Sequence, residues 1–132
     1  MIRMNGRYLL DSNIVIALLS GDQSVIDQID QASEIFLPSI GIGELYYGAF
    51  NSSKKQTNVD RIDQLRSQVT VLDCDDFTAK FYGQIKKALK DKGTPIPEND
   101  IWIGAIAMQY ELTVATRDNH FLNIEGLGVD KW

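Results

Sequence analysis

The chain has 132 residues, of which 44% are hydrophobic and 23% are charged. This length fits one domain spanning 1–132, and the composition excludes a disordered chain because it supplies enough apolar surface for a buried core. Thirteen basic and 18 acidic side chains give a net charge of −5, so the molecule as a whole repels polyanions, although clustered carboxylates can still bind a cation locally.

The cysteine content and the N-terminal segment predict a cellular location. A single cysteine, Cys74, excludes an internal disulfide and favours a reducing compartment, so we expect a cytoplasmic protein. Residues 1–7 lack the long apolar stretch of a signal peptide, and Met4 is an alternative start. No segment approaches the roughly 18 apolar residues of a membrane span. We therefore expect neither export nor a membrane anchor.

The first third of the chain predicts a strand, two helices and a second strand. A short apolar run at 8–10 predicts a strand that ends at Asp11, and 14–19 continue as a helix. Asp22 can cap the next helix through its side chain. The run at 35–37 predicts a buried strand.

The middle of the chain predicts two helices and a third strand. Ser39 is the expected N-cap of a helix that runs to about Phe50. Three apolar residues at helical spacing mark the following helix: Val59, Ile62 and Leu65. Residues 69–72 predict a strand.

The last third predicts two helices and two strands. One helix begins at Asp75 and ends at Gly93, and its apolar residues recur every four positions, which predicts one buried stripe. The stripe consists of Phe77, Phe81, Ile85 and Leu89. Residues 100–110 predict a largely buried helix, and 112–115 and 128–130 predict strands. The alternation of short strands with helices indicates an α/β fold with a mainly parallel sheet covered by helices on both faces.

Four acidic residues lie where predicted strands end or helices begin. Asp11 closes the first strand, and Glu44 lies about one turn into the helix after the second. Asp100 opens a buried helix, and Asp118 follows the strand at 112–115. Ligands of open α/β sheets bind beyond the carboxyl ends of the strands, so these acids can meet at one point.

A cluster of four carboxylates predicts a cation site. The charges repel one another unless cations neutralise them or protons are taken up. Oxygen ligands without a set of His or Cys favour Mg²⁺ or Mn²⁺ and disfavour zinc. One or two such ions can activate water and stabilise the leaving oxygen of a phosphodiester, so hydrolysis of a nucleic acid follows. Taken singly, each acid has a simpler explanation as a helix cap or as a partner of the helix dipole.

Four segments of the sequence resemble the PIN domains, and in particular the VapC-type toxins of toxin-antitoxin pairs. They are Leu9-Leu10-Asp11-Ser12-Asn13, Gly43-Glu44-Leu45-Tyr46-Tyr47-Gly48, Asn99-Asp100-Ile101-Trp102-Ile103-Gly104-Ala105 and Thr116-Arg117-Asp118 with His120-Phe121. Their order and spacing cover nearly the whole chain. Two departures stand out, because Ser12 replaces the usual Thr and the fourth acid, Asp118, is the family's most variable position.

The resemblance implies a fold, an activity and partners. The fold is a three-layer sandwich with a mainly parallel sheet of about four to five strands. The metal-binding and catalytic acids are Asp11, Glu44, Asp100 and Asp118, supported by Ser12, Asn13 and Thr116. The resemblance further implies a Mg²⁺- or Mn²⁺-dependent endoribonuclease, a homodimer, and a cognate antitoxin that blocks the site.

Other charged and reactive side chains have competing explanations. Arg117 can contact a substrate phosphate or pair with a nearby acid. The lysines of one helix region can meet an RNA backbone but are more simply a solvated face; they are Lys80, Lys86, Lys87, Lys90 and Lys92. Cys74 and His120 could form a nucleophile and base, but no third orienting residue is identifiable. Tyr46 and Tyr47 could stack on bases, but packing in the core or in a dimer interface is the simpler explanation.

Two alternative functions remain open at the level of sequence. The first is a PIN-fold module that binds RNA or protein without catalysis. The second is a receiver-like signalling domain, which needs paired acids after the first strand and a lysine after the last. Here Ser12 and Asn13 follow Asp11, and the late lysine, Lys131, lies at the end of the chain.

Overall fold

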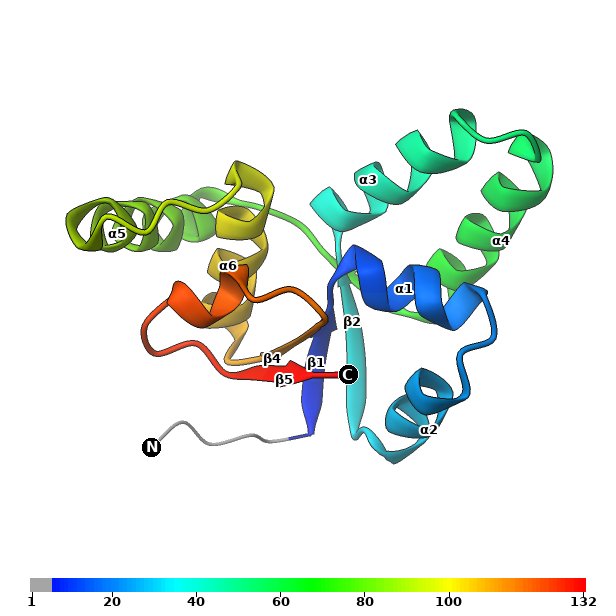
Figure 1. Cartoon of the computed structure of the whole chain (residues 1–132), viewed down its shortest axis with the longest axis horizontal. Helices are drawn as coiled ribbons and strands as arrows, with labels where there is room; N and C mark the ends of the chain where they lie inside the picture. Colours follow the sequence, from blue (N-terminus) through cyan, green and yellow to red (C-terminus); the bar gives the residue numbers. More distant parts are fainter. Residues whose placement is uncertain (1–5) are drawn as a thin grey trace.

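The computed structural model describes residues 6–132, so the alternative start at Met4 lies outside the described residues. In chain order the elements are β1 (Arg7–Leu10), α1 (Ser12–Leu19), α2 (Gln23–Gln31), β2 (Glu34–Pro38), α3 (Ser39–Phe50), α4 (Lys55–Gln68), β3 (Thr70–Leu72), α5 (Asp76–Lys92), α6 (Glu98–Tyr110), β4 (Thr113–Thr116), the 3₁₀ helix η1 (His120–Asn123) and β5 (Val129–Lys131). The predicted alternation of strands and helices is confirmed (Figure 1). No helix within residues 6–132 is both long and apolar enough to cross a membrane.

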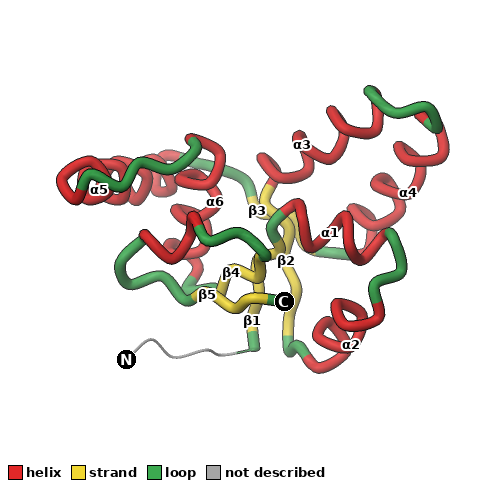
Figure 2. The backbone as a smooth tube through the Cα atoms, in the orientation of Figure 1, coloured by secondary structure: helices red, strands yellow, loops and turns green. Residues whose placement is uncertain are grey.

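The five strands form one parallel sheet in the order β3-β2-β1-β4-β5. Helices cover both of its faces, so the molecule has three layers (Figure 2). Successive side chains of a strand point to opposite faces, and the two central leucines of β1 show this directly. Leu9 packs with residues of α5 and α6, whereas Leu10 packs with residues of α1, α3 and α4. The predicted three-layer α/β fold is therefore confirmed.

The strand order places a topological switch point between β1 and β4. From β1 the chain adds β2 and then β3 on one side, and it then crosses back to place β4 on the other side of β1. Leu10 is paired with Ala115, and the Asp11 amide donates to the Ala115 carbonyl at 3.0 Å. Such a switch point opens a crevice at the carboxyl ends of the strands. Asp11 lies at this crevice.

Helix starts differ from the predictions in three places, two of them next to a proline. The first helix, α1, begins at Ser12 and not at Ile14, because Asp11 caps it. Ser39 is the first residue of α3 rather than its N-cap, because the extended Pro38 occupies the cap position and no side chain caps the helix. The last long helix, α6, begins at Glu98 instead of Asp100. The Pro97 carbonyl already accepts from the amides of Asp100 and Ile101, which starts the helical turn earlier.

The predicted apolar stripe of α5 is wrong at its first position. Ile85 and Leu89 are buried, but Phe77 is 67% exposed. Thr78 takes the buried place instead: its hydroxyl bonds to Asp75 in a capping box and to Gln109 of α6. The capping box therefore fixes the orientation of the first turn, and Phe77 faces outward.

Candidate metal centre

Asp11 lies at the end of β1, at the switch point, and is held by its neighbours. It is the N-cap of α1, and one carboxylate oxygen accepts from the Ser12 amide at 2.9 Å. The other oxygen accepts from the Thr116 hydroxyl at 2.8 Å. Only 6% of Asp11 is exposed. These two bonds fix the carboxylate where β1 and β4 end side by side.

Asp100 and Asp118 meet at the same edge from different elements. Asp100 comes from the first turn of α6, and Asp118 follows β4. The Asp118 amide donates to the Thr116 hydroxyl at 2.9 Å, so Thr116 contacts the segments of both Asp11 and Asp118. His120 lies between the two acids, with Nδ1 at 2.9 Å from Asp100 Oδ2 and 3.1 Å from Asp118 Oδ1.

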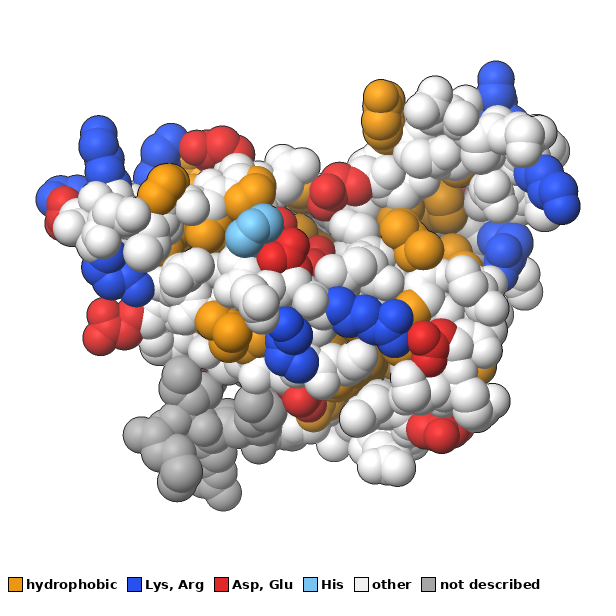
Figure 3. Space-filling model, in the orientation of Figure 1, with side chains coloured by type: hydrophobic (Ala, Val, Ile, Leu, Met, Phe, Trp, Pro, Cys, Tyr) orange, Lys and Arg blue, Asp and Glu red, His pale blue; other side chains and the backbone are white. Residues whose placement is uncertain are grey.

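Glu44 reaches the cluster from α3. Its carboxylate accepts from the Ser12 hydroxyl at 3.2 Å. It also lines a hollow of about 480 Å³ together with residues of the α6 start and of the loop after β4. The acidic and imidazole groups in that lining are Glu44, Glu98, Asp100, Asp118 and His120. In Figure 3 acidic side chains and the single histidine gather at this hollow, which lies between α3 and α6.

The structure brings two of the four predicted acids, Asp100 and Asp118, into one group with His120. Asp11 and Glu44 lie beside this group, Asp11 through its bond with Thr116 and Glu44 through the shared hollow. Ser12 donates to both Asp11 and Glu44, and Thr116 donates to Asp11. Asn13 acts less directly, because its side-chain oxygen accepts from the Arg117 amide at 3.3 Å, next to Asp118. The supporting side chains therefore hold the chain segments that carry the acids.

The anionic forms of two of the acids, Asp11 and Asp100, are destabilised by their surroundings. Burial raises the pKa of Asp11, and the charge of Asp118 raises it further, although hydrogen bonds from Thr116 and Ser12 oppose the shift. Burial also raises the pKa of Asp100, and the charges of Asp11 and Asp118 add to the effect. A divalent cation relieves this repulsion, and the donor set, mainly carboxylate oxygens, suits a hard ion such as Mg²⁺ or Mn²⁺. The residues present therefore fit such an ion.

His120 contacts two of the predicted acids but was not among the predicted site residues. Together with Asp100 and Asp118 it offers ligand atoms that lie within 4.8 Å of one another. Its position two residues after Asp118, in the last of the four family-like segments, was the available signal. The alternative pairing of His120 with Cys74 receives no support, because the imidazole contacts Asp100 and Asp118 and burial raises the pKa of the Cys74 thiol.

Arg117 forms an ion pair, which was one of its two predicted alternatives. Its partner is Asp22, which is far away in the sequence. Its guanidinium donates to Asp22 at 2.7 Å and to the backbone carbonyl of Trp132 at 3.1 Å. Hydrogen bonds from Ser24, followed by the bond from Arg117, lower the pKa of Asp22 to about 2. Contact of Arg117 with a substrate phosphate stays a prediction.

The lysines of α5 are exposed, as a solvated face requires. Three of them have partners: Lys86 pairs with Glu98, Lys87 with Asp91, and Lys92 donates to the Asn123 carbonyl. The two tyrosines of α3 differ from each other. Tyr46 is partly buried and bonds to Asp63, whereas Tyr47 is 74% exposed and is not part of the core.

Comparison with known proteins decides the family. Residues 8–127 match the PIN domain. The chain belongs to the PIN domain family. This PIN domain is similar to Ribonuclease VapC2 of Haemophilus influenzae, with 33% identity over 129 residues that cover 96% of this chain and 98% of that protein. It is also similar to the tRNA(fMet)-specific endonuclease VapC of Salmonella typhimurium, with 30% identity over 129 residues, 96% of this chain and 98% of that protein.

Solved structures agree with the assignment of this PIN domain. A chain in the crystal structure of VapBC2 from Rickettsia felis, bound to a DNA fragment from their promoter, superposes with a TM-score of 0.88 at 28% identity, covering 95% of this chain and 98% of that chain. A chain in the DNA-bound VapBC of Salmonella typhimurium gives a TM-score of 0.88 at 29% identity, covering 96% and 98%. The resemblance stated from the four sequence segments is therefore confirmed.

Proposed function

We propose that the cluster of Asp11, Glu44, Asp100 and Asp118 binds one or two Mg²⁺ or Mn²⁺ ions, with which the chain hydrolyses RNA phosphodiester bonds as the toxin of a VapBC-type pair. The chain is a VapC-type ribonuclease by family, since VapC ribonucleases match it over nearly their full length. The observation that carries the metal proposal is the convergence of these acids at the switch point. When bound, such an ion activates a water molecule and stabilises the leaving oxygen.

The chain's own residues supply the geometry for this chemistry. Ser12 and Thr116 orient Asp11 by donating to its two oxygens. The Thr116 hydroxyl also accepts from the Asp118 amide. One hydroxyl group therefore bonds to the Asp11 side chain and to the backbone of Asp118. A site held by such bonds keeps its ligands in place before the substrate arrives. The hollow of about 480 Å³ leaves Glu44, Asp100 and Asp118 accessible to a phosphodiester.

One of the two alternative functions is excluded, and the other is left to experiment. Membership of the PIN family excludes the receiver-like signalling domain. A PIN-fold module without catalysis has the same fold, so only a measured reaction distinguishes it from a nuclease.

We expect the purified protein to cleave structured RNA in the presence of Mg²⁺ or Mn²⁺ and to lose this activity in EDTA. The reason is that four carboxylates without a cation repel the phosphate of the substrate. Cleavage is followed on gels with a labelled RNA, and adding excess Mn²⁺ to the EDTA-treated sample is the control that restores it. Equal cleavage with and without EDTA would contradict the metal proposal, and RNA binding with no cleavage under either condition would favour the non-catalytic module.

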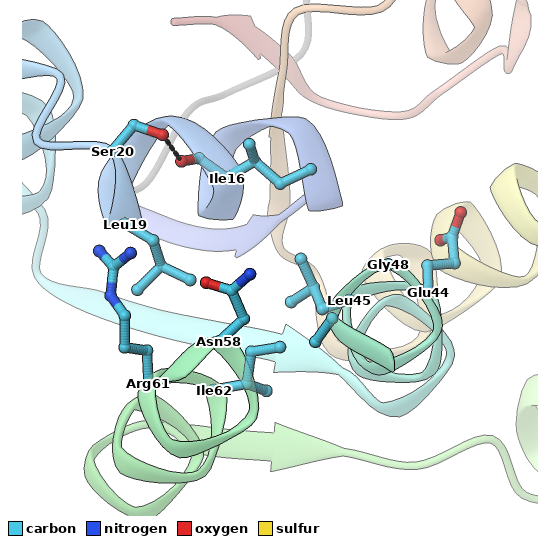
Figure 4. A pocket seen from close by; sticks show the side chains of 10 residues that line it. Ile16, Leu19, Ser20, Glu44, Leu45, Gly48, Asn58, Arg61 and Ile62 are labelled. Atoms are coloured by element: carbon cyan, nitrogen blue, oxygen red, sulfur yellow. Dashed lines mark hydrogen bonds between the residues drawn. The ribbon is translucent and has the colours of Figure 1, made fainter. Parts of the chain in front are cut away.

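An antitoxin partner is proposed because relatives with matching folds were crystallised as toxin-antitoxin complexes, among them VapBC of Rickettsia felis. The surface we assign to it is an apolar groove between α1, α3 and α4, with a volume of about 300 Å³ (Figure 4). Its apolar lining includes Ile16, Leu19, Leu45 and Ile62. Glu44 lines both this groove and the acidic hollow, so a segment seated in the groove comes next to the metal centre. The homodimer stays a prediction.

We expect Ile16→Asp to weaken binding of the antitoxin at least about tenfold, which equals about 1.4 kcal/mol. The Ile16 side chain is 56% exposed at the groove, and a carboxylate there loses apolar contact area and must be desolvated on binding. Affinity is measured by titration calorimetry with the purified cognate antitoxin. Phe77→Asp is the matched control, because Phe77 is 67% exposed on α5, away from the groove lining. Equal affinities of the two variants would contradict the assignment.

A further inference from the structure

His120 joins two acids that come from separate elements. Its Nδ1 lies 2.9 Å from Asp100 Oδ2 on α6 and 3.1 Å from Asp118 Oδ1 after β4. Both neighbours are carboxylate oxygens, and ionised carboxylates only accept, so the tautomer with its hydrogen on Nδ1 is the one that donates to them. The backbone amide of His120 also donates to Asp118 Oδ1 at 2.9 Å. Asp118 therefore has a second bond to this residue, while Asp100 depends on the imidazole.

The imidazole is held in place by the core beneath it. His120 begins η1, and the next residue, Phe121, is completely buried in the cluster that includes residues of α6 and β4. The side chain of His120 itself is 45% exposed, so the core fixes its backbone while the ring lies at the wall of the acidic hollow. The ring position is thus determined by packing and not by the acids alone.

We propose that His120 is a positioning residue, which sets the spacing of Asp100 and Asp118 for the bound ion by donating from Nδ1. This inference rests on the proposed metal-dependent function. The bonds described for the two acids use Asp100 Oδ2 and Asp118 Oδ1, and they leave the other oxygen of each carboxylate available to a cation. Coordination by Nδ1 itself would break the bond to Asp100. Carboxylates that ligate metals are commonly held by such outer hydrogen bonds, and loss of one costs about 10–100-fold in metal affinity.

The test measures Mn²⁺ binding, which does not depend on catalytic activity. Titration calorimetry and the EPR signal of free Mn²⁺ give the affinity of the wild-type protein and of two variants. His120→Ala removes the donor, so we expect Mn²⁺ to bind about 10–100-fold more weakly. His120→Asn places an amide N–H close to the position of Nδ1–H, so we expect an affinity within a few-fold of wild type. Leu122→Ala is the control in the same short helix, since Leu122 is 60% exposed, and it leaves the affinity unchanged.

A second measurement separates positioning from direct ligation. Pulsed EPR of bound Mn²⁺ detects a directly bound nitrogen, and we expect no such coupling in the wild-type protein. A strong coupling that disappears in His120→Ala would overturn the inference, because His120 would then be a ligand. Unchanged affinity of His120→Ala, or an affinity of His120→Asn as low as that of His120→Ala, would also overturn it. If wild type cleaves RNA and binds Mn²⁺ but His120→Ala binds equally well, only the positioning role fails; absence of Mn²⁺ binding by wild type overturns the proposed function as well.

Discussion

Replacing Asp11 with asparagine is expected to reduce RNA cleavage on the order of a thousand-fold, about 4 kcal/mol of transition-state stabilisation, while the chain stays folded. Asp11 is the most buried of the four acids, and its two oxygens are oriented by Ser12 and Thr116. Asparagine has nearly the same shape but no negative charge, so it fills the space and weakens the hold on the cation. Cleavage is measured under single-turnover conditions, and folding is checked by circular dichroism.

The matched control for this substitution is Asp30→Asn. Asp30 is exposed on α2, and the same charge is removed outside the cluster. We expect this variant to cleave RNA at the wild-type rate. If both variants lost activity equally, overall charge would be responsible and not the metal centre. An active Asp11→Asn variant would remove Asp11 from the catalytic site.

Asp11→Asn lowers activity, but we expect it to raise the stability of the metal-free protein. Burial, with added repulsion from Asp118, raises the folded-state pKa of Asp11 above its ordinary value of 3.8. Between the ordinary pKa and the raised folded-state pKa, the folded chain binds more protons than the unfolded chain. The free energy of unfolding therefore falls as the pH rises through this window, and it stays lowered at higher pH. Asparagine carries no such penalty. In EDTA at pH 7, Asp11→Asn should therefore melt at a higher temperature than wild type, whereas Mg²⁺ should raise the melting temperature of wild type more than that of the variant.

Replacing Phe121 with alanine is expected to destabilise the protein by about 3–5 kcal/mol. Phe121 is completely buried, and its side chain is the largest of the fully buried ones among the described residues. It lies in the core cluster with Leu9, Ile106 and Val114. The loss comprises the transfer energy of the ring and the cavity that it leaves. The expected loss is a large fraction of the total stability of a domain, which is about 5–15 kcal/mol. Thermal unfolding should shift downward by roughly 10–20 °C.

The neighbouring residue provides the control for this prediction. Leu122 is 60% exposed, so Leu122→Ala should change stability by no more than about 0.5 kcal/mol. Phe121 also anchors the backbone that carries His120, so a loosened η1 should weaken Mn²⁺ binding in Phe121→Ala but not in Leu122→Ala. Similar melting temperatures for the two variants would show that the site around Phe121 collapses without cost, contrary to the packing described here.

The short segment from β4 to η1 contributes both to the core and to the acidic cluster. It contains buried residues such as Phe121, which stabilise the fold, and also Asp118, whose charge raises the pKa of Asp11. Without a cation, the repulsion among Asp11, Asp100 and Asp118 is a cost that the core must offset. A bound divalent cation would offset that repulsion.

Local patterns in the sequence were sufficient to predict most elements of the fold. Apolar runs such as 35–37 determine strands, and capping residues such as Asp22, Asp75 and Gly93 mark helix ends, because these signals act over a few neighbouring residues. The same local rules were wrong where another element intervened. Phe77 faces outward because the buried place belongs to Thr78, which bonds to Gln109 of α6, a partner far away in the chain.

The four acids could be proposed from the sequence because each lies at the end of a predicted strand or near the start of a helix, where ligands of parallel sheets bind. The order of the strands could not be predicted from the sequence, because it depends on which edge of the sheet each crossover connection reaches. That order places β4 beside β1, which brings the Thr116 hydroxyl to Asp11 and joins Asp100 to Asp118 through His120. It also directs Arg117 to Asp22. The sequence by itself determined the elements and the acidic chemistry; only tertiary packing decided which side chains orient those acids, because hydrogen bonds between distant residues form after the sheet is assembled.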